Sequence, residues 1–159
     1  MNTLLLSLCV IMPATLEMSK KQAAVVCKYE SLIIKEANRN KVEPELLAAL
    51  IYVESSFRPR VVSSANACGL TQIIPKWTGG PETGRKKYTC NQLKNPRTSI
   101  KVGAQILGYI VKYYTNENVD KALCMYNAGT KCLKRKNFYK KLFYVKKVRM
   151  IYDAITNGC

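Results

Sequence analysis

The chain has 159 residues, of which 26 are Lys or Arg, 10 are Asp or Glu and none is His, giving a formal net charge of +16. This length suits one domain with a single core, and a hydrophobic content of 48% excludes a disordered chain. Without His the sequence lacks the commonest catalytic base and metal ligand, so acid–base chemistry must come from Glu, Asp, Lys, Tyr or Cys.

The N-terminus carries an uncharged apolar run at residues 4–12, in the string MNTLLLSLCVIMPATLEMSK. The run is too short to span a bilayer but long enough for the hydrophobic region of a signal peptide. No Lys or Arg precedes it and no A-x-A site follows it, so a buried N-terminal helix is the alternative. We predict a signal peptide at residues 1–20, a single domain at residues 21–159, and an exported protein that is periplasmic or associated with the cell wall.

Five segments show a helical pattern of apolar residues. They are residues 22–38, residues 44–56 beginning at Pro44, a segment that follows the string NPRTS, a shorter one from Asn118 to Gly129, and residues 138–156. Residues predicted to face the core are Val25, Val26, Tyr29, Leu32 and Ile33; Ile100, Gly103, Ala104, Leu107, Ile110 and Tyr114; and Phe138, Leu142, Val145, Val148, Tyr152 and Ile155. Lys140, Lys141, Lys146 and Lys147 are predicted to face solvent.

About forty residues rich in Gly, Pro and polar types separate the second helix from the third. Loops of this length within a compact domain are usually functional. No segment is clearly a β-strand. The predicted fold class is therefore mainly α, with a long irregular loop between the second and third helices.

The seven cysteines carry information about the compartment. Loss of Cys9 with a signal peptide would leave six, and an even number in a small exported domain predicts up to three disulfides with fifteen possible pairings. These six are Cys27, Cys68, Cys90, Cys124, Cys132 and Cys159. Reduced, buried thiols in a cytosolic protein are the alternative. No metal or other cofactor is expected, since there is no C-x-x-C pair and no His.

The string YVESSF at residues 52–57 contains one acid at the end of an apolar stretch. Leu47, Leu50 and Glu54 have the spacing that places side chains on one face of a helix. A carboxyl group in apolar surroundings keeps its proton near neutral pH and can act as a general acid. A structural Glu that caps a helix or forms an ion pair is the alternative.

Five short strings occur in order: ESSF at Glu54, CGLTQI containing Gly69 to Ile73, NPRTSIKVGAQIL from Asn95, MYNAG from Met125 and YVKKVRMIY from Tyr144. Together they resemble the catalytic domain of soluble lytic transglycosylases, the peptidoglycan-cleaving relatives of goose-type lysozyme. The resemblance covers roughly residues 29–152. It implies a lysozyme-like fold.

The resemblance implies that Glu54 is the catalytic acid. It assigns Ser55, Ser56, Gln72, Tyr126, Asn127 and Tyr144 to substrate binding, with Tyr126 and Asn127 beside the acid and Tyr126 as a candidate hydrogen-bond partner of Glu54. Thr71 replaces the usual Met, which implies an altered apolar wall in the sugar-binding groove. Lys140 replaces a common Glu, which affects one groove contact.

The chemistry implied by the family needs a single acid. Ordinary glycosidases use two carboxylates, but Glu82 is the only acid between Ser55 and Asn116. In the transglycosylase scheme, Glu54 protonates the glycosidic oxygen and then accepts the proton of the C6 hydroxyl, which closes a 1,6-anhydro ring on N-acetylmuramic acid. One residue that serves first as acid and then as base needs a pKa near the working pH.

Two other functions fit parts of the sequence. A hydrolytic muramidase would use water in place of the C6 hydroxyl. A non-catalytic cationic protein would bind the wall through residues 131–148, which contain eight Lys or Arg. The expected partner is the glycan strand of peptidoglycan, with a secretion, conjugation or phage apparatus as a further candidate, and no nucleic acid partner is expected.

Overall fold

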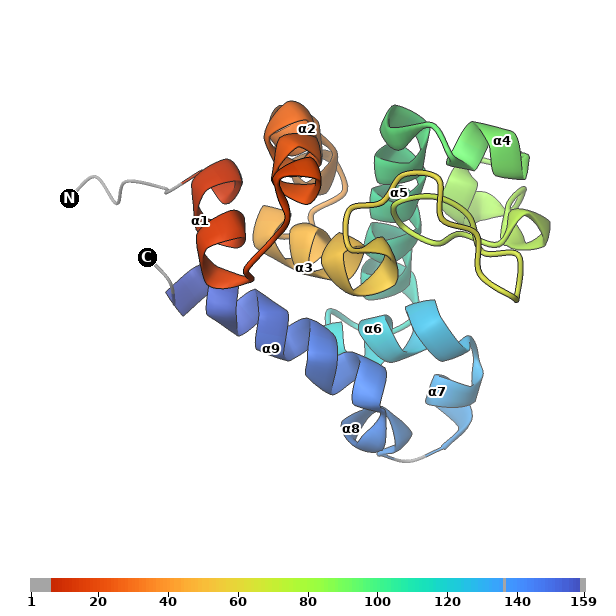
Figure 1. Cartoon of the computed structure of the whole chain (residues 1–159). Helices are drawn as coiled ribbons and strands as arrows, with labels where there is room; N and C mark the ends of the chain where they lie inside the picture. The colour runs from red at the N-terminus through yellow and green to blue at the C-terminus, as the bar shows by residue number, and fades with distance from the viewer. Residues whose placement is uncertain (1–6, 136, 158–159) are drawn as a thin grey trace.

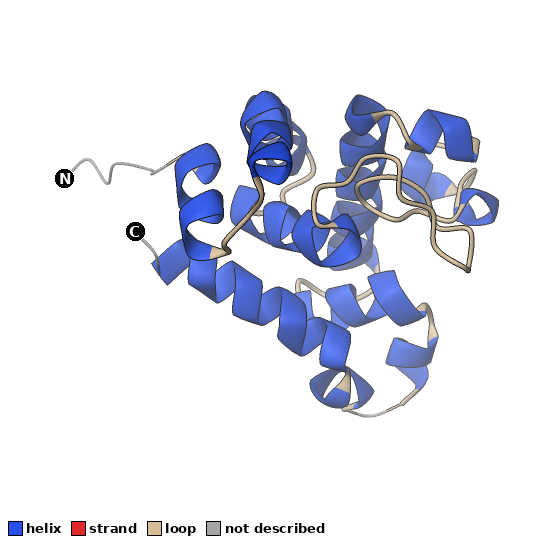
Figure 2. Cartoon of the chain, viewed as in Figure 1, coloured by secondary structure: helices blue, strands red, loops and turns tan. Residues whose placement is uncertain are grey.

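The computed structural model describes residues 7–135 and 137–157, and these residues form helices joined by loops, without a named β-strand (Figure 2). Two isolated bridges pair Cys68 with Val62 and with Ile73. The helices are α1 (Leu8–Thr15), α2 (Lys20–Arg39), α3 (Pro44–Ser55), η1 (Pro75–Trp77), η2 (Pro81–Thr83), α4 (Cys90–Leu93), α5 (Pro96–Tyr113), α6 (Val119–Ala128), α7 (Lys131–Lys134), α8 (Phe138–Lys141) and α9 (Phe143–Asn157). The prediction of a mainly α fold is confirmed.

The starts of three helices have local causes, although α5 begins at Pro96, inside the string NPRTS that the prediction placed before the helix. Pro44 occupies the first position of α3, where its missing N–H costs nothing. Asn95 caps α5 by accepting from the backbone N–H groups of Arg97 and Thr98, and Asn118 caps α6 in the same way. Helix α6 ends at Gly129, whose φ of 67° is a conformation that glycine adopts without strain.

Helix α3 lies between α2 and α9 and contacts both (Figure 1). Its Leu47, Leu50 and Ile51 are fully buried. Helix α2 also packs on α5, and α5 on α6, so one core joins the N-terminal and C-terminal halves of the chain. This packing fixes the end of α3, where Glu54 lies, against the start of α9.

Two details of the predicted helical patterns differ from the structure, one in the C-terminal segment and one at the end of α5. The segment 138–156 is not one helix, because Leu142 has an extended backbone and separates α8 from α9. Tyr114 is 49% exposed and does not face the core as predicted. Val145, Val148 and Ile155 are buried as predicted, and the four lysines Lys140, Lys141, Lys146 and Lys147 are exposed.

The N-terminal apolar run forms α1, which packs on α2 and α9 (Figure 1). Leu8, Ile11 and Met12 are buried, and a disulfide joins Cys9 to Cys27. The structure thus contains the buried N-terminal helix that the sequence left open as an alternative. A signal peptide at residues 1–20 stays a prediction, and residues 1–6 lie outside the described part of the chain.

Two more disulfides join Cys68 to Cys90 and Cys124 to Cys132. The number of three disulfides agrees with the prediction, but the set of six cysteines does not. Cys27 pairs with Cys9, which the prediction had assigned to a removed segment, and Cys159 lies outside the described residues. The difference arises because α1 packs beside α2 and brings Cys9 to Cys27.

The long segment between α3 and α5 is held in place by a small core of its own. Cys68, Ile73, Tyr88, Leu93 and Val102 pack together, and the Cys68–Cys90 disulfide closes the segment. It contains η1, η2 and α4, which the sequence did not predict. Among the described residues, no helix has the length and apolar character needed to cross a membrane.

Candidate active site

Glu54 lies in the last turn of α3, at a half-buried position that follows a buried apolar stretch. Burial raises the pKa of its carboxyl group from the ordinary 4.5 to about 7, and a hydrogen bond from Tyr144 partly opposes this rise. Burial is the larger of these two effects, so the pKa stays above its ordinary value. The site therefore holds a single acid that exchanges its proton near neutral pH.

Tyr144 lies in the first turn of α9 and is the hydrogen-bond partner of that acid. Its hydroxyl donates to Oε1 of Glu54 over 2.6 Å. Burial, followed by the charge of Glu54, raises the pKa of Tyr144 well above its ordinary value. The phenol therefore stays protonated and remains a donor while Glu54 changes its charge.

Tyr126 lies on α6 close to Glu54, but it does not hydrogen-bond the acid. Its hydroxyl donates to the backbone carbonyl of Thr71 over 2.8 Å. Burial and the charge of Glu54 raise the pKa of Tyr126 well above its ordinary value. The hypothesis that Tyr126 binds the carboxyl group of Glu54 is therefore wrong in this structure, and Tyr144 fills that role.

Thr71 is fully buried against α5 and does not form a wall of a sugar-binding groove. Its backbone N–H donates to Oγ of Ser99 over 3.1 Å, and its hydroxyl donates to the Ser99 carbonyl over 2.9 Å. A Cβ at Gly103 would come within 2.4 Å of the Thr71 methyl group. Gly103 was predicted to face the core and is buried, with Thr71 as its neighbour. The expected change in an apolar groove wall is not found.

Gln72 follows Thr71 and has a left-handed backbone with a φ of 50°. Its side-chain Nε2 donates to the carbonyl oxygens of Gly69 and Val61, over 2.9 and 3.1 Å. The amide nitrogen of Gln72 thus stabilises the loop. The left-handed backbone and the two bonds fix this side chain before any ligand binds.

The remaining predicted substrate-binding residues lie in different environments. Ser55 is 1% exposed and its hydroxyl donates to the Ile51 carbonyl, so its side chain is directed into α3 and not towards a ligand. Ser56 is half-buried and ends α3 in a left-handed conformation. Asn127 is exposed near the end of α6. The structure brings Glu54, Tyr144 and Tyr126 together and does not place Ser55 at the ligand-accessible surface.

Ser99, which lies outside the predicted set, supports the site through Thr71, whose carbonyl accepts a hydrogen bond from Tyr126. Ser99 accepts a hydrogen bond from the buried Thr71. Gly103 lies one turn later on α5 and leaves room for Thr71, so this glycine is the sequence feature that could have indicated the contact. Trp77 is 66% exposed, so it is not a core residue. Lys140, which replaces a common Glu, is exposed on α8. In the described ranges, no group of three or more Cys, Asp or Glu side chains is arranged to hold a metal ion.

Comparisons with known proteins relate the chain to lytic transglycosylases. The profile of the family described as "Transglycosylase SLT domain" matches residues 31–147. The chain is 31% identical over 138 residues to membrane-bound lytic murein transglycosylase C of Actinobacillus pleuropneumoniae, covering 80% of this chain and 35% of that protein. It is 32% identical over 90 residues to membrane-bound lytic murein transglycosylase E of Buchnera aphidicola, covering 54% of this chain and 41% of that protein. The chain thus spans less than half the length of these relatives.

Two solved structures share the fold. The 70 kDa soluble lytic transglycosylase of Escherichia coli superposes with a TM-score of 0.70 at 23% identity, over 81% of this chain and 24% of that one. An inactive mutant of lytic transglycosylase Slt from Pseudomonas aeruginosa gives a TM-score of 0.62 at 20% identity, over 93% of this chain and 28% of that one. At these identities the likeness establishes the lysozyme-like fold, while the family profile covers most of the chain. The chain therefore belongs to the transglycosylase SLT family.

Proposed function

We propose that the protein is a peptidoglycan lytic transglycosylase that cleaves the β-1,4 bond between N-acetylmuramic acid and N-acetylglucosamine. Glu54 is the catalytic acid and then the base. The observation that carries this proposal is a single buried carboxyl group with a pKa of about 7, held by the Tyr144 hydroxyl. Names of the relatives, which are lytic murein transglycosylases, support the same substrate.

In the first step, protonated Glu54 donates its proton to the glycosidic oxygen, and the bond from C1 of N-acetylmuramic acid to that oxygen breaks. Glutamate then accepts the proton of the C6 hydroxyl as the C6 oxygen bonds to C1. The product is a 1,6-anhydro sugar, and Glu54 regains its proton. A pKa near 7 suits both steps, because the protonated and the ionised forms of Glu54 are both well populated at neutral pH.

Tyr144 would support both states of the acid. As a donor it favours the ionised carboxylate, and therefore stabilises Glu54 just after the proton has left. Burial favours the neutral acid, which is needed to begin the reaction. The two opposing effects set the pKa near the working pH.

The mass of the products tests this proposal against the two rival functions. A transglycosylase releases muropeptides that end in an anhydro sugar, whereas a hydrolytic muramidase releases products heavier by one water. A non-catalytic wall-binding protein releases neither. Mass spectrometry of fragments released from purified sacculi separates the three, and hydrated products alone would overturn the transglycosylase assignment.

We also propose that the protein acts outside the cytoplasm, in the periplasm or at the cell wall, and that residues 1–20 form a signal peptide. The names of the relatives support export, and so do the Cys68–Cys90 and Cys124–Cys132 disulfides, which remain after removal of residues 1–20. The Cys9–Cys27 disulfide would be lost with that segment. Edman sequencing of the protein recovered from the periplasm tests the cleavage. Co-purification with a secretion, conjugation or phage apparatus would identify the partner at which the enzyme acts.

A further inference from the structure

Helix α9 lies along the edge of the molecule and exposes one of its sides (Figure 1). Val145, Val148 and Ile151 face the core, whereas four residues on the opposite side are exposed. We call these four residues the α9 face: Phe143, Lys146, Lys147 and Met150. At about 3.6 residues per turn their side chains lie within an arc of about 100° of the helix circumference, so they form one continuous stripe.

Two large apolar side chains of the α9 face lie in water. Phe143 is 76% exposed and Met150, two turns later, is 61% exposed. Single exposed apolar side chains are common on proteins, whereas apolar side chains gathered on one face mark a contact surface. This pair therefore indicates a partner that can remove both side chains from water.

The α9 face is also cationic. Lys146 and Lys147 lie between the two apolar residues along the helix. In the described part of the chain the one ion pair joins Arg149 to Asp120, so no carboxylate contacts the lysines of the α9 face. Two more exposed lysines lie on α8, which contacts α9: Lys140 and Lys141. Because these two precede Phe143 by no more than three residues, their Cα atoms lie within about 11 Å of it.

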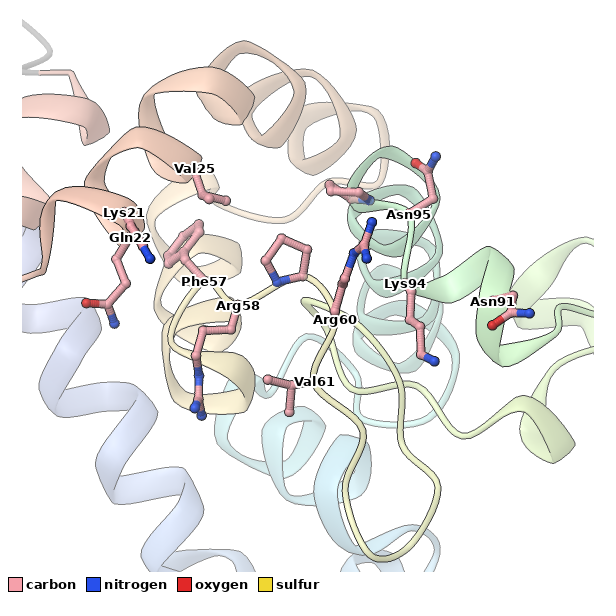
Figure 3. Close-up of a pocket in the computed structure, with 12 residues that line it drawn as sticks. Lys21, Gln22, Val25, Phe57, Arg58, Arg60, Val61, Asn91, Lys94 and Asn95 are labelled. Carbon is pink, nitrogen blue, oxygen red and sulfur yellow. The ribbon is translucent and has the colours of Figure 1, made fainter.

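The α9 face is separate from two grooves of the molecule. A groove of about 970 Å³ beside the start of α2 is lined by residues of segments 21–25, 57–61 and 91–96 (Figure 3). A groove of about 520 Å³ lies beside α7. None of the four residues of the α9 face lines either groove. The exposed stripe therefore suits contact with a broad surface.

We propose that the α9 face binds the surface of an anionic lipid bilayer. Headgroup phosphates attract the lysines, and the acyl region beneath them takes Phe143 and Met150 out of water. Lysine side chains can reach the headgroups while their apolar stems lie against the acyl chains. A soluble polyanion offers the charges but no apolar phase. The two kinds of side chain on one stripe therefore favour the bilayer.

This contact would fix the orientation of the protein on the membrane. Tyr144 directly follows Phe143 and donates to Glu54 from the inner side of α9. The proposed active site would then lie about 10 Å, the diameter of a helix, from the lipid surface. The binding itself does not depend on the proposed function, because it is measured on vesicles without any glycan.

The test measures binding of the whole protein to vesicles that contain equal parts of phosphatidylglycerol and phosphatidylcholine, with pure phosphatidylcholine vesicles as the neutral comparison. Two double variants remove the charges and the apolar side chains of the α9 face separately: Lys146→Gln/Lys147→Gln and Phe143→Gln/Met150→Gln. Two matched controls make the same kinds of change at exposed positions of α2 and α5: Lys35→Gln/Lys112→Gln and Ile34→Gln/Tyr113→Gln. Every substituted side chain is exposed, so the fold should stay intact.

We expect the wild type and both controls to bind the anionic vesicles, and each α9 variant to bind them at least about tenfold more weakly. Absence of binding by the wild type, equal binding to neutral vesicles, or the same loss in a control would overturn the proposal. Loss in the lysine variant alone would assign the face to a soluble polyanion, and loss in the apolar variant alone would assign it to an uncharged partner. Either of these results also overturns the bilayer.

Fluorescence tests which side of the protein meets the lipid. The chain has one tryptophan, Trp77, which lies on η1 in the loop between α3 and α4. The variant Trp77→Phe/Phe143→Trp moves the single indole to the α9 face. Anionic vesicles should shift its emission to shorter wavelength and leave the emission of the wild type unchanged. An unshifted variant, or an equal shift in the wild type, would overturn the assignment of the α9 face.

Discussion

The hydroxyl of Tyr144 donates to the carboxyl group of Glu54 across a sequence separation of 90 residues. The acid comes from the end of α3 and its partner from the start of α9, which pack against each other. The proposed acid is therefore set by two elements from opposite ends of the domain, and a change in either partner should alter the chemistry of the site.

Replacing Glu54 by Gln should abolish wall cleavage while leaving the protein folded. The amide keeps the shape of the side chain but has no proton to transfer, and a positioned acid typically contributes about 10² to 10⁴ in rate. Release of anhydro-muropeptides is the measurement. Activity above about a tenth of the wild type would rule out Glu54 as the acid, since the expected loss is much larger.

The same Glu54→Gln variant should be more stable than the wild type at alkaline pH. The pKa of Glu54 is raised on folding, so its contribution to stability is complete below pH 4.5 and is lost as pH rises through about 7. The amide of the variant does not ionise, and the difference at about pH 8 is on the order of 2 kcal/mol. Thermal unfolding of both proteins at about pH 5 and about pH 8 measures it, and equal melting temperatures at the higher pH would contradict the raised pKa.

Replacing Tyr144 by Phe should lower turnover and shift the pH profile. The hydrogen bond lowers the pKa of Glu54, so its loss should raise that pKa and move the alkaline limb of activity to higher pH. A hydrogen bond to a charged group contributes about 1.5 to 3 kcal/mol. If the Tyr144 bond reaches this strength only once the proton has left Glu54, its loss corresponds to a decrease in rate of roughly ten- to a hundredfold.

Tyr126→Phe is the matched control for this experiment. This change removes the hydrogen bond from Tyr126 to the Thr71 carbonyl and leaves the hydrogen bond from Tyr144 to Glu54 intact. We expect a stability loss on the order of 1 kcal/mol and no movement of the alkaline limb. A shift of the limb in Tyr126→Phe but not in Tyr144→Phe would reverse the assignment of the two tyrosines.

Peptide mapping without reduction should find the pairs Cys9–Cys27, Cys68–Cys90 and Cys124–Cys132 in protein that keeps its N-terminus. If residues 1–20 are removed during export, Cys9 goes with them and Cys27 loses its partner. Mapping the protein recovered from the periplasm therefore decides both the pairing and the cleavage. Free thiols at Cys68 and Cys90 in that sample would contradict the structure.

Gly69→Ala should destabilise the loop that carries Gln72. An added Cβ would lie 1.9 Å from the Leu93 carbonyl oxygen, and the φ of 81° strains any other residue. We expect a loss of at least about 2 kcal/mol, since both overpacking and backbone strain contribute. Gly84→Ala is the control, because its φ of 60° is similar but no atom lies within 4 Å of the added Cβ. Chemical denaturation of both variants measures the difference, and equal losses would show that backbone strain alone acts at Gly69.

Features encoded within a few residues could be predicted from the sequence. The starts of α3 and α6 follow from Pro44 and Asn118, and the position of Glu54 at the end of an apolar helix follows from Leu47 and Leu50. Such signals depend on local hydrogen bonds and helical spacing, which the sequence shows directly. The start of α5 was predicted several residues too late, after the string NPRTS.

Features that depend on distant packing could not be predicted. Both Tyr126 and Tyr144 follow helical patterns, and only the packing of α6 and α9 decides which hydroxyl reaches Glu54. The break at Leu142 was not predicted, because apolar residues continue at helical spacing across it. Thr71 was misplaced for a similar reason, since its burial follows from a contact with Ser99, 28 residues away.

The order of α3 and α9 along the chain has a consequence for biosynthesis. A nascent polypeptide on the ribosome holds Glu54 long before Tyr144 has been made, and α3 has no α9 to pack against during that time. The carboxyl group then lies in water, where it ionises like any free glutamate. The proposed catalytic acid would thus reach its raised pKa only when α9 docks on α3.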